Sequence, residues 1–384
     1  MTKRKLRSIS LLLCLVLAIP LLFSAADAFA PTSAQALSFY DGELDYASVM
    51  SEPELLDGSV SVALSDAELR TMRLYPGGIP FGVKFMTDGV LIVGFCDITS
   101  NGKRVNPSAD AGLKTGDRLV SVNGQPLTSA EELTAAVENS GGKTLSIVYR
   151  RGEQSYTATL TPAFCSSEGC YKTGIYVKDN GAGIGTVTYI DPDTLSFGGL
   201  GHGICEESGK PLSIKRGSVV DVTVNGAIKG QKGVPGEIKG SFKTGKTGTL
   251  LKNTACGVYG AFASLPDGLP EGPLPLGTRG TLKEGKAYIY CTLDSSGPRR
   301  YEIEISSIDK SATEGKCFTV RVTDPALLSQ TGGIVQGMSG SPIIQNGKLV
   351  GAVTHVLIND PTTGYGIFIE NMLSAANTPM AKAS

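Results

Sequence analysis

The chain has 384 residues, of which 18% are charged, and its formal net charge at pH 7 is -1. This balance gives no electrostatic case for a nucleic-acid partner, and tryptophan is absent, so stacking surfaces are also unsupported. The length suggests two domains and a leader. The 49 glycines and 20 prolines indicate many turns, as expected of an exported, β-rich protein.

The first 30 residues have the features of a targeting segment. Basic residues at 2–7 precede a nearly all-apolar run at 8–23, and small residues follow, with possible cleavage triplets at 26–28 and 28–30. The apolar run is short for a transmembrane helix, which needs about 20 residues. We therefore expect residues 1–30 to be a signal peptide or a membrane anchor, and the body of the chain to be exported.

Residues 31–76 are expected to be a linker or pro-segment. The stretch is acidic and has one hydrophobic patch, Val60–Leu64. A Tyr-Pro-Gly-Gly sequence at 75–78 marks a boundary, since proline and glycine interrupt regular structure.

Cysteines and histidines argue against a metal site. One of the eight cysteines lies in the leader, and the odd number left in the body implies at least one unpaired or intermolecular thiol in an exported protein. No Cys/His cluster has zinc spacing, because His202 has only Cys205 nearby. The sequence therefore predicts no metal and no organic cofactor.

Residues 77–163 carry the pattern of a small α+β module. Strands are predicted at 78–85 and 89–95, followed by Ala-Gly-Leu-x-x-Gly-Asp-x-Leu-x-x-Val-Asn-Gly at 111–124. A helix at 129–140 opens with a capping box, and strands at 143–150 and 154–161 close the module. This pattern resembles a PDZ domain.

PDZ domains bind an extended peptide as an added strand beside a helix. The resemblance implies that a glycine-containing loop offers N–H groups to a terminal carboxylate. Here that loop is expected at Gly78, Ile79, Pro80, Phe81 and Gly82. A PDZ domain used only as an internal brace is the alternative.

Residues 170–376 are predicted to form short strands separated by glycine turns, which is typical of a barrel or sandwich. No long amphipathic helix interrupts them. About 200 residues suffice for a pair of β-barrels.

Ser339 is the predicted nucleophile of this region. It lies in Gly-Met-Ser-Gly-Ser-Pro, residues 337–342, a glycine-rich turn before a β-hairpin. Glycines let the backbone bend and let a substrate carbonyl approach, and the N–H groups of Gly337 and Ser339 would stabilise an oxyanion. The arrangement resembles that of chymotrypsin-like serine proteases. Ser341 is the alternative, but Pro342 directly after it disfavours a substrate-facing pose.

The base must be one of only two histidines, because a serine mechanism needs a group that takes and returns the hydroxyl proton. His202 lies in a glycine-rich bend after an apolar strand, which suits an imidazole at the edge of a cleft, and it is the predicted base. His355 lies within a predicted strand and is expected near the cleft or in the core. The order His202 before Ser339 matches the chymotrypsin-like order.

The segment 349–356 resembles the strand that binds substrate beside the nucleophile, which implies substrate contacts at Thr354, His355 and Val356. The segment 364–369 resembles the return strand of the specificity pocket. The expected fold class is mainly β: an N-terminal leader, a PDZ domain (α+β) and a chymotrypsin-like double β-barrel peptidase domain at 170–376.

The motifs taken together resemble the stage IV sporulation protein B family of serine peptidases. They are the PDZ module, Leu-Gly-His-Gly at 200–203, Thr-Asp-Pro at 323–325 and Gly-Gly-Ile-Val-Gln-Gly-Met-Ser-Gly-Ser-Pro at 332–342. The resemblance implies an endopeptidase of endospore-forming bacteria that crosses the forespore membrane and acts between forespore and mother cell. It also implies self-cleavage near the N-terminus, expected between about Leu37 and Met72.

The family further implies a protein substrate and a set of site residues. The substrate is the extracytoplasmic part of a regulator of a membrane metalloprotease, whose cleavage activates processing of a late sigma-factor precursor. The nucleophile falls on Ser339, the base on His202 and the acid on Asp324, which would hold the histidine tautomer. Asp324 lies close before the serine, unlike the acid of ordinary chymotrypsin-like enzymes, and Asp221 and Asp360 are rivals.

Two other functions are alternatives. A catalytically inactive secreted PDZ scaffold would be expected to lack Ser339 or His202, and both are present. A general extracytoplasmic quality-control protease usually carries its peptidase before the PDZ domain, and the order here is reversed. The sequence favours the regulatory endopeptidase, with the chain itself as one substrate and the membrane contacted through the N-terminal segment.

Overall fold

The computed structural model describes residues 38–39, 49, 51–55, 64–152, 154–205 and 209–377. The expected leader, residues 1–30, lies outside the described residues. Within the described ranges, no helix has the length and apolar character needed to cross a bilayer. The seven cysteines of the body are all described and are all free thiols.

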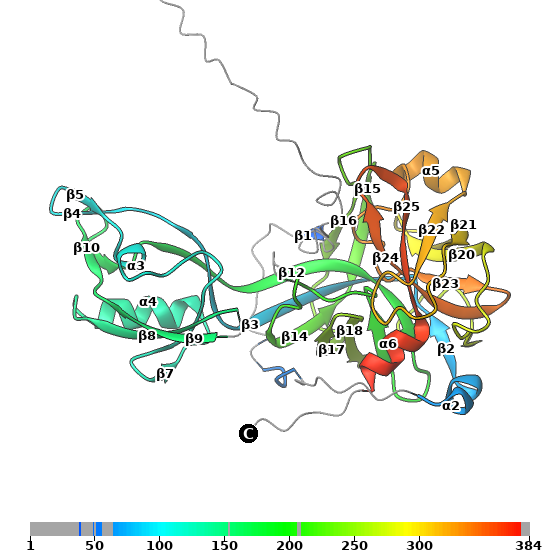
Figure 1. Cartoon of the computed structure of the whole chain (residues 1–384), viewed down its shortest axis with the longest axis horizontal. Helices are drawn as coiled ribbons and strands as arrows, with labels where there is room; N and C mark the ends of the chain where they lie inside the picture. Colours follow the sequence, from blue (N-terminus) through cyan, green and yellow to red (C-terminus); the bar gives the residue numbers. More distant parts are fainter. Residues whose placement is uncertain are drawn as a thin grey trace, which may run out of the picture. The chain divides into compact units, whose positions relative to one another are not determined.

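Six strands close into a first barrel, in the order β12, β13, β18, β17, β14 and β3, with β3 pairing back to β12 (Figure 1). Phe81, Val83 and Phe85 alternate along β3 and point into one core, because successive side chains of a strand face opposite sides. The strand bounds are β3 Pro80–Phe95, β12 Ile175–Ile190, β13 Ser196–Gly199, β14 Ile214–Val220, β17 Gly248–Thr254 and β18 Gly257–Phe262.

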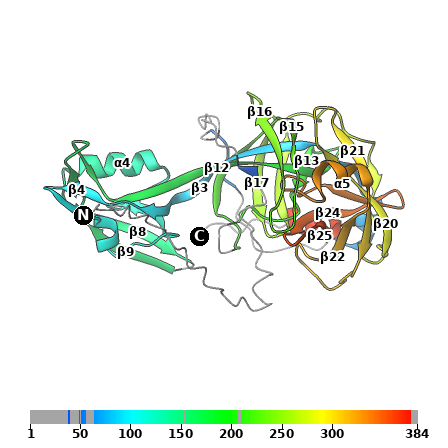
Figure 2. The same cartoon turned by 90° about the horizontal axis from the view of Figure 1, so that it is seen from above.

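Six later strands close into a second barrel, in the order β20, β21, β22, β25, β24 and β23 (Figure 2). Ile289, Phe318 and Ile343 are at most 1% exposed in its core. Two six-stranded barrels confirm the predicted mainly-β, chymotrypsin-like fold. The elements are β20 Gly285–Thr292, β21 Pro298–Ser306, β22 Phe318–Val322, α5 Pro325–Thr331, β23 Pro342–Gln345, β24 Lys348–Leu357, β25 Asp360–Phe368 and α6 Ile369–Ala376.

The PDZ domain is inserted between two strands of the first barrel. The first half of β3 pairs within the barrel, and its second half, from Val90, pairs with β6 of the PDZ sheet. In the same way, the first residues of β12, Ile175 to Lys178, pair with β3 in the PDZ sheet before β12 enters the barrel. The predicted PDZ start at residue 77 is therefore wrong, because residues 80–87 are barrel strand.

The PDZ sheet has the order β12, β3, β6, β8 and β9, and α4 covers it (Figure 2). The predicted capping box is confirmed, since the Ser129 hydroxyl accepts from the Glu132 N–H while the Glu132 carboxylate accepts from the Ser129 N–H. The elements are β4 Ile98–Ser100, β5 Lys103–Val105, α3 Pro107–Asp110, β6 Arg118–Val122, β7 Gln125–Pro126, α4 Ala130–Asn139, β8 Leu145–Arg151, β9 Gln154–Leu160, β10 Ala163–Cys165 and β11 Cys170–Lys172.

Parts of the expected linker pack on the peptidase domain. Helix α2 (Asp66–Thr71) leads into β2 (Arg73–Pro76), which pairs with β12 and with β19 (Leu274–Pro275). Further upstream, Glu52 is 2% exposed and forms an ion pair with Lys246 at 2.6 Å. Within the expected linker, apolar and ionic contacts therefore hold residues 51–55 and 64–76 against the peptidase domain. Strand β1 (Ser38–Phe39) also pairs with β12.

Candidate active site

Ser339 lies in a tight turn between α5 and β23. Gly337 and Gly340 on either side have φ values of 93° and 95°, a region that favours glycine. The Ser339 side chain is buried, and its hydroxyl donates to the carbonyl of Thr354 on β24 at 2.7 Å. The turn therefore presents the hydroxyl to the predicted substrate strand.

The first barrel approaches this turn closely. A Cβ at Gly340 would lie 2.0 Å from the Thr186 carbonyl oxygen and 2.5 Å from the Leu200 nitrogen. Threonines of β12 hold the turn: the Thr186 hydroxyl donates to the Gly337 carbonyl at 2.7 Å, and the Thr188 hydroxyl to the Gly340 carbonyl at 2.8 Å. The turn that carries Ser339 is thus bound to both barrels.

The orientation of the Gln336–Gly337 peptide is set by a separate hairpin, β15 (Val222–Ile228) and β16 (Glu237–Phe242). The Ile238 N–H donates to the Gln336 carbonyl at 2.8 Å. Because a trans peptide is planar, the Gly337 N–H points to the opposite side from that carbonyl. Neither this N–H nor that of Ser339 donates to another described residue. Both remain available for the predicted oxyanion hole.

His202 follows β13 in a bend in which Leu200 and Gly201 have positive φ values. The imidazole is 3% exposed, and its Nδ1 donates to the Gly203 carbonyl at 2.8 Å. Its Nε2 has no hydrogen-bond partner among the described residues. Burial lowers the pKa of His202, an effect that the Gly203 hydrogen bond partly offsets. The ring is therefore neutral, with an unprotonated Nε2, which is the form of a general base.

The bend that carries His202 lies against the strand that receives the Ser339 hydroxyl. A Cβ at Gly201 would lie 2.9 Å from the Thr354 Cγ2 atom. The two predicted residues thus lie in neighbouring segments, but the Ser339 hydroxyl bonds the Thr354 carbonyl instead of Nε2. For the predicted proton transfer to His202, the Ser339 hydroxyl has to leave the Thr354 carbonyl first.

His355 stacks beside His202. The two ring centroids are 4.9 Å apart and the planes are tilted by 36°. Burial, followed by the nearby charges of His202 and Lys316, lowers the pKa of His355 to about 3. Two such close imidazoles disfavour double protonation. The expectation of a strand histidine near the cleft agrees with this position.

Asp324 is not brought to His202. Its carboxylate forms the N-cap of α5, where Oδ1 accepts from the N–H groups of Ala326 at 2.9 Å and Leu327 at 3.1 Å. Its Oδ2 accepts from the Glu302 N–H at 3.2 Å. The prediction that Asp324 orients the histidine is wrong in this structure, because one carboxylate oxygen accepts from backbone N–H groups of α5 and the other from a backbone N–H group of β21.

The rival acids are also engaged elsewhere. Asp360 accepts from the hydroxyls of Thr362 and Thr363, which lower its pKa. Asp221 faces Lys243 at 4.0 Å. Among the described residues, no carboxylate bonds His202.

The predicted PDZ carboxylate loop is also misplaced. The Gly78 N–H donates to the Val187 carbonyl at 2.8 Å, and Ile79 and Phe81 are buried in the first barrel. Residues 78–82 therefore cannot receive a peptide at the PDZ domain. An edge strand of the PDZ sheet near α4 is β12, whose Asp179 carboxylate accepts from the Ala130 N–H at the start of α4 at 2.7 Å.

The sequence contained a signal for this alternative edge. Gly174 immediately precedes the strand residues Ile175 to Val177, and it has a φ of 80°. The pattern was missed because the segment lies beyond the expected PDZ boundary at 163.

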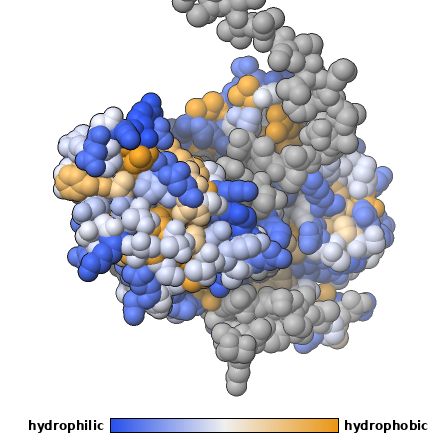
Figure 3. All heavy atoms as spheres, turned by 60° about the vertical axis from the view of Figure 1, so that its left-hand side comes forward, coloured by the Kyte–Doolittle hydropathy of each residue, from blue (hydrophilic) through white to orange (hydrophobic). Residues whose placement is uncertain are grey.

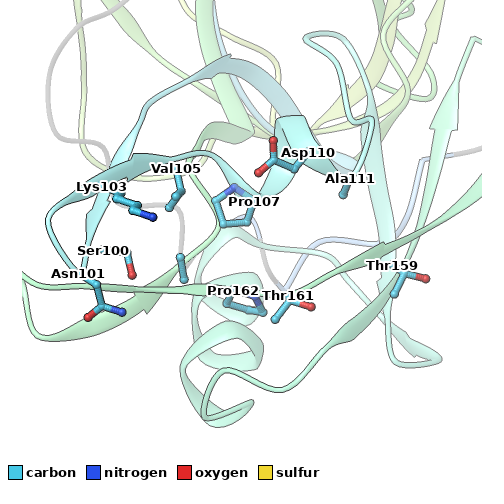
Figure 4. A pocket seen from close by; sticks show the side chains of 11 residues that line it. Ser100, Asn101, Lys103, Val105, Pro107, Asp110, Ala111, Thr159, Thr161 and Pro162 are labelled. Carbon is cyan, nitrogen blue, oxygen red and sulfur yellow. The ribbon is translucent and has the colours of Figure 1, made fainter.

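A pocket of the PDZ domain contains none of the predicted site residues (Figure 4). It lies between the β4–β5 hairpin, α3 and the end of β9, and Lys103, Asp110 and Pro162 line it.

In Figure 3, one face of the molecule is mainly hydrophilic, with hydrophobic side chains in small groups. The described residues hold no group of His, Cys, Asp or Glu suited to a metal ion.

Two closed barrels that bring a glycine-bounded serine near a buried histidine define a chymotrypsin-like serine endopeptidase with an inserted PDZ domain. Residues 169–373 match the SpoIVB peptidase S55 family, and the chain belongs to that family. Residues 105–151 match a PDZ domain.

Parts of the chain also match two curated proteins and a solved structure. A stretch of 88 residues is 32% identical to a Neisseria meningitidis protein whose name describes a zinc metalloprotease, covering 23% of this chain and 17% of that protein. Another of 56 residues is 39% identical to serine protease HTRA1 of Xenopus laevis, covering 15% of this chain and 12% of that protein. The match to the structure of the Rv3671c protease of M. tuberculosis in its active form covers 53% of this chain and 77% of that protein's chain, with 15% identity and a TM-score of 0.29. The chain thus spans less than a fifth of the length of these curated relatives.

Proposed function

We propose that this serine endopeptidase is an exported sporulation-signalling enzyme that crosses the forespore membrane and cleaves itself. It then cuts the extracytoplasmic part of a membrane-protease regulator and so activates processing of a late sigma-factor precursor. The observation that carries the proposal is membership of the SpoIVB peptidase S55 family, whose name points to sporulation. The apolar segment near the N-terminus supports export.

The proposed chemistry uses a serine nucleophile and a histidine base. Ser339 Oγ attacks the scissile carbonyl while His202 Nε2 takes its proton, and His202 then gives that proton to the leaving amine. The N–H groups of Gly337 and Ser339 bind the oxyanion that forms. Water then repeats the sequence on the acyl-enzyme and releases the second product.

Substrate binding is proposed along β24, at Thr354, His355 and Val356. An extended substrate there donates a backbone N–H to the Thr354 carbonyl. That carbonyl now accepts the Ser339 hydroxyl at 2.7 Å. Substrate therefore displaces the hydroxyl and lets it turn toward His202, so binding and activation of the nucleophile are linked.

The PDZ domain is proposed to bring protein substrates to the enzyme. Its peptide would add to the edge of β12 near α4, since PDZ domains extend a sheet beside a helix. Tyr176 and Lys178 on this strand are exposed.

Intact mass over time tests the peptidase site. Protein comprising residues 31–384 is incubated beside the Ser339→Ala, His202→Ala and Ser341→Ala variants. Defined fragments from the parent and from Ser341→Ala, but not from the other two, are expected. Fragments from Ser339→Ala would refute the assigned nucleophile, and an intact parent would contradict self-cleavage without a partner.

A cellular experiment tests the signalling role. The Ser339→Ala gene replaces the parent gene in its spore-forming host, and the late sigma-factor precursor is followed by immunoblot. The precursor is expected to persist unprocessed in the variant. Normal processing would contradict the proposed signalling function and leave the enzyme class untouched.

A further inference from the structure

We propose that Asn253 is a positioning residue for His202: it holds the Gly203–Ile204 peptide, whose carbonyl accepts the Nδ1 hydrogen that an aspartate accepts in a Ser-His-Asp triad. The proposal rests on His202 being the base of the proposed function. It names a residue that the sequence motifs did not single out, on a strand of the first barrel.

Asn253 binds the segment that follows His202 with every polar group of its side chain. It lies near the end of β17, and its Oδ1 accepts from the Ile204 N–H at 2.8 Å. Its Nδ2 donates to the carbonyls of Ile204 at 2.8 Å and Leu212 at 2.9 Å. Two donors and one acceptor on one short side chain require an amide, because a carboxylate has no donor when ionised.

The backbone of Gly203 lies directly against Asn253 and Thr254 at the end of β17. A Cβ at Gly203 would lie 2.6 Å from the Thr254 carbonyl oxygen and 3.5 Å from Asn253 Oδ1. A side chain at residue 203 would push the bend away from β17. Glycine at this position therefore lets the histidine bend reach the end of the strand.

One peptide unit connects Asn253 to His202. The Gly203 carbonyl and the Ile204 N–H belong to the same planar trans peptide and point in opposite directions. Asn253 Oδ1 holds the N–H side, which fixes the direction of the carbonyl on the other side. That carbonyl accepts the hydrogen of His202 Nδ1 at 2.8 Å.

The arrangement performs the orienting part of a triad acid without a charge. A carbonyl acceptor keeps the hydrogen on Nδ1 and leaves Nε2 ready to accept a proton. A neutral acceptor stabilises the imidazolium less than a carboxylate does. This agrees with the burial of the ring, which keeps its pKa below the ordinary value.

The tautomer of His202 tests the proposal directly. The chain has two histidines, so a ¹⁵N-histidine-labelled Ser339→Ala/His355→Gln protein shows the imidazole of His202 alone. Long-range ¹H–¹⁵N spectra at pH 7.5 are expected to show the Nδ1–H tautomer. Adding Asn253→Ala is expected to introduce the Nε2–H tautomer, whereas Asn225→Ala, which removes a surface hydrogen bond to Ser241, leaves the spectrum unchanged.

Kinetics give the second measurement. With His355 and Ser339 intact, Asn253→Ala is expected to lower kcat about tenfold with little change in KM, because most of the enzyme then holds the wrong tautomer. An Nε2–H tautomer in the protein that keeps Asn253 would overturn the proposal, and this result does not depend on whether Asn253→Ala folds. An unchanged Nδ1–H signal after Asn253→Ala would overturn it as well. Activity retained by His202→Ala would instead refute the assigned base, a failure that the tautomer spectra do not depend on.

Discussion

Thr186 of the first barrel donates hydrogen bonds to two carbonyls of the turn that carries Ser339, the proposed nucleophile. Its hydroxyl donates to the Gly337 carbonyl at 2.7 Å, and its N–H donates to the Ser339 carbonyl at 3.1 Å. Both the hydroxyl and the turn are buried. The geometry of a turn in the second barrel therefore depends on a strand of the first barrel.

Removal of this hydroxyl is expected to impair both stability and catalysis. Thr186→Val keeps the shape of the side chain but leaves the buried Gly337 carbonyl without its donor, which costs about 1–3 kcal/mol. We expect kcat to fall about tenfold, since a loosened turn misplaces the nucleophile. Urea unfolding in a Ser339→Ala background and peptide cleavage in the active protein measure the two effects. Thr134→Val on the exposed face of α4 is the control, and equal effects of the two variants would contradict the prediction.

Substitutions of Gly340 and Gly347 distinguish the effect of close packing from the effect of backbone strain. Both have positive φ values, but a Cβ at Gly340 would meet Thr186 and Leu200, whereas a Cβ at Gly347 meets nothing within 4 Å. We expect Gly347→Ala to cost about 1–2 kcal/mol and to leave activity unchanged. Gly340→Ala is expected to cost about 3 kcal/mol or more and to abolish cleavage. Similar melting temperatures for the two variants would show that the barrels do not approach at Gly340.

Asp324 is expected to stabilise the fold and to take no part in proton transfer. Loss of its N-cap hydrogen bonds in Asp324→Ala costs about 0.5–2 kcal/mol, and Asp324→Ser, which keeps a capping oxygen, is expected to recover most of this. At a temperature well below the transition, kcat of both variants should stay within about threefold of the parent. A fall of more than about 100-fold in kcat for a folded Asp324→Ser protein would restore Asp324 as the triad acid.

Histidine burial predicts a loss of stability in acid. The pKa of His355 is about 3 in the folded chain against an ordinary 6.5, so below pH 6.5 the unfolded chain binds a proton that the folded chain does not. Unfolding therefore becomes easier as pH falls from 6.5 toward 3, by at most about 1.4 kcal/mol per pH unit. His355→Gln in a Ser339→Ala background should lose less stability between pH 7.5 and 4.5 in urea unfolding. The same loss in both proteins would show that the ring is protonated in the folded state.

The activity of the enzyme should also extend into mild acid. Because burial lowers the pKa of His202, the base stays unprotonated below the ordinary histidine range. The acidic limb of kcat/KM against pH is therefore expected to have its midpoint below 6.5. A midpoint above 6.5 would indicate a negative charge beside the ring.

The sequence by itself determined the fold class, the PDZ module and the enzyme class, because these depend on local patterns. Strand-length apolar runs between glycines predicted barrels, and Ser129 with Glu132 predicted the start of α4. The glycines around Ser339 marked a turn of the kind that a nucleophile needs. With only two histidines in the chain, the choice of a candidate base was also small.

The tertiary structure alone decided which distant segments meet. The PDZ resemblance placed Gly78–Gly82 in the PDZ domain, but strand pairing over long sequence separation puts them in the first barrel and gives the PDZ edge to β12. The family resemblance implied Asp324 as the acid, with Asp221 and Asp360 as rivals, but the Asp324 carboxylate caps the N-terminus of α5. Asn253 lies 51 residues after His202. A hydrogen bond between residues so far apart in the chain produces no pattern that can be recognised in the sequence. Closure of the barrels brings these groups together, because it pairs the backbone N–H and C=O groups of the strands and buries their apolar side chains at the same time.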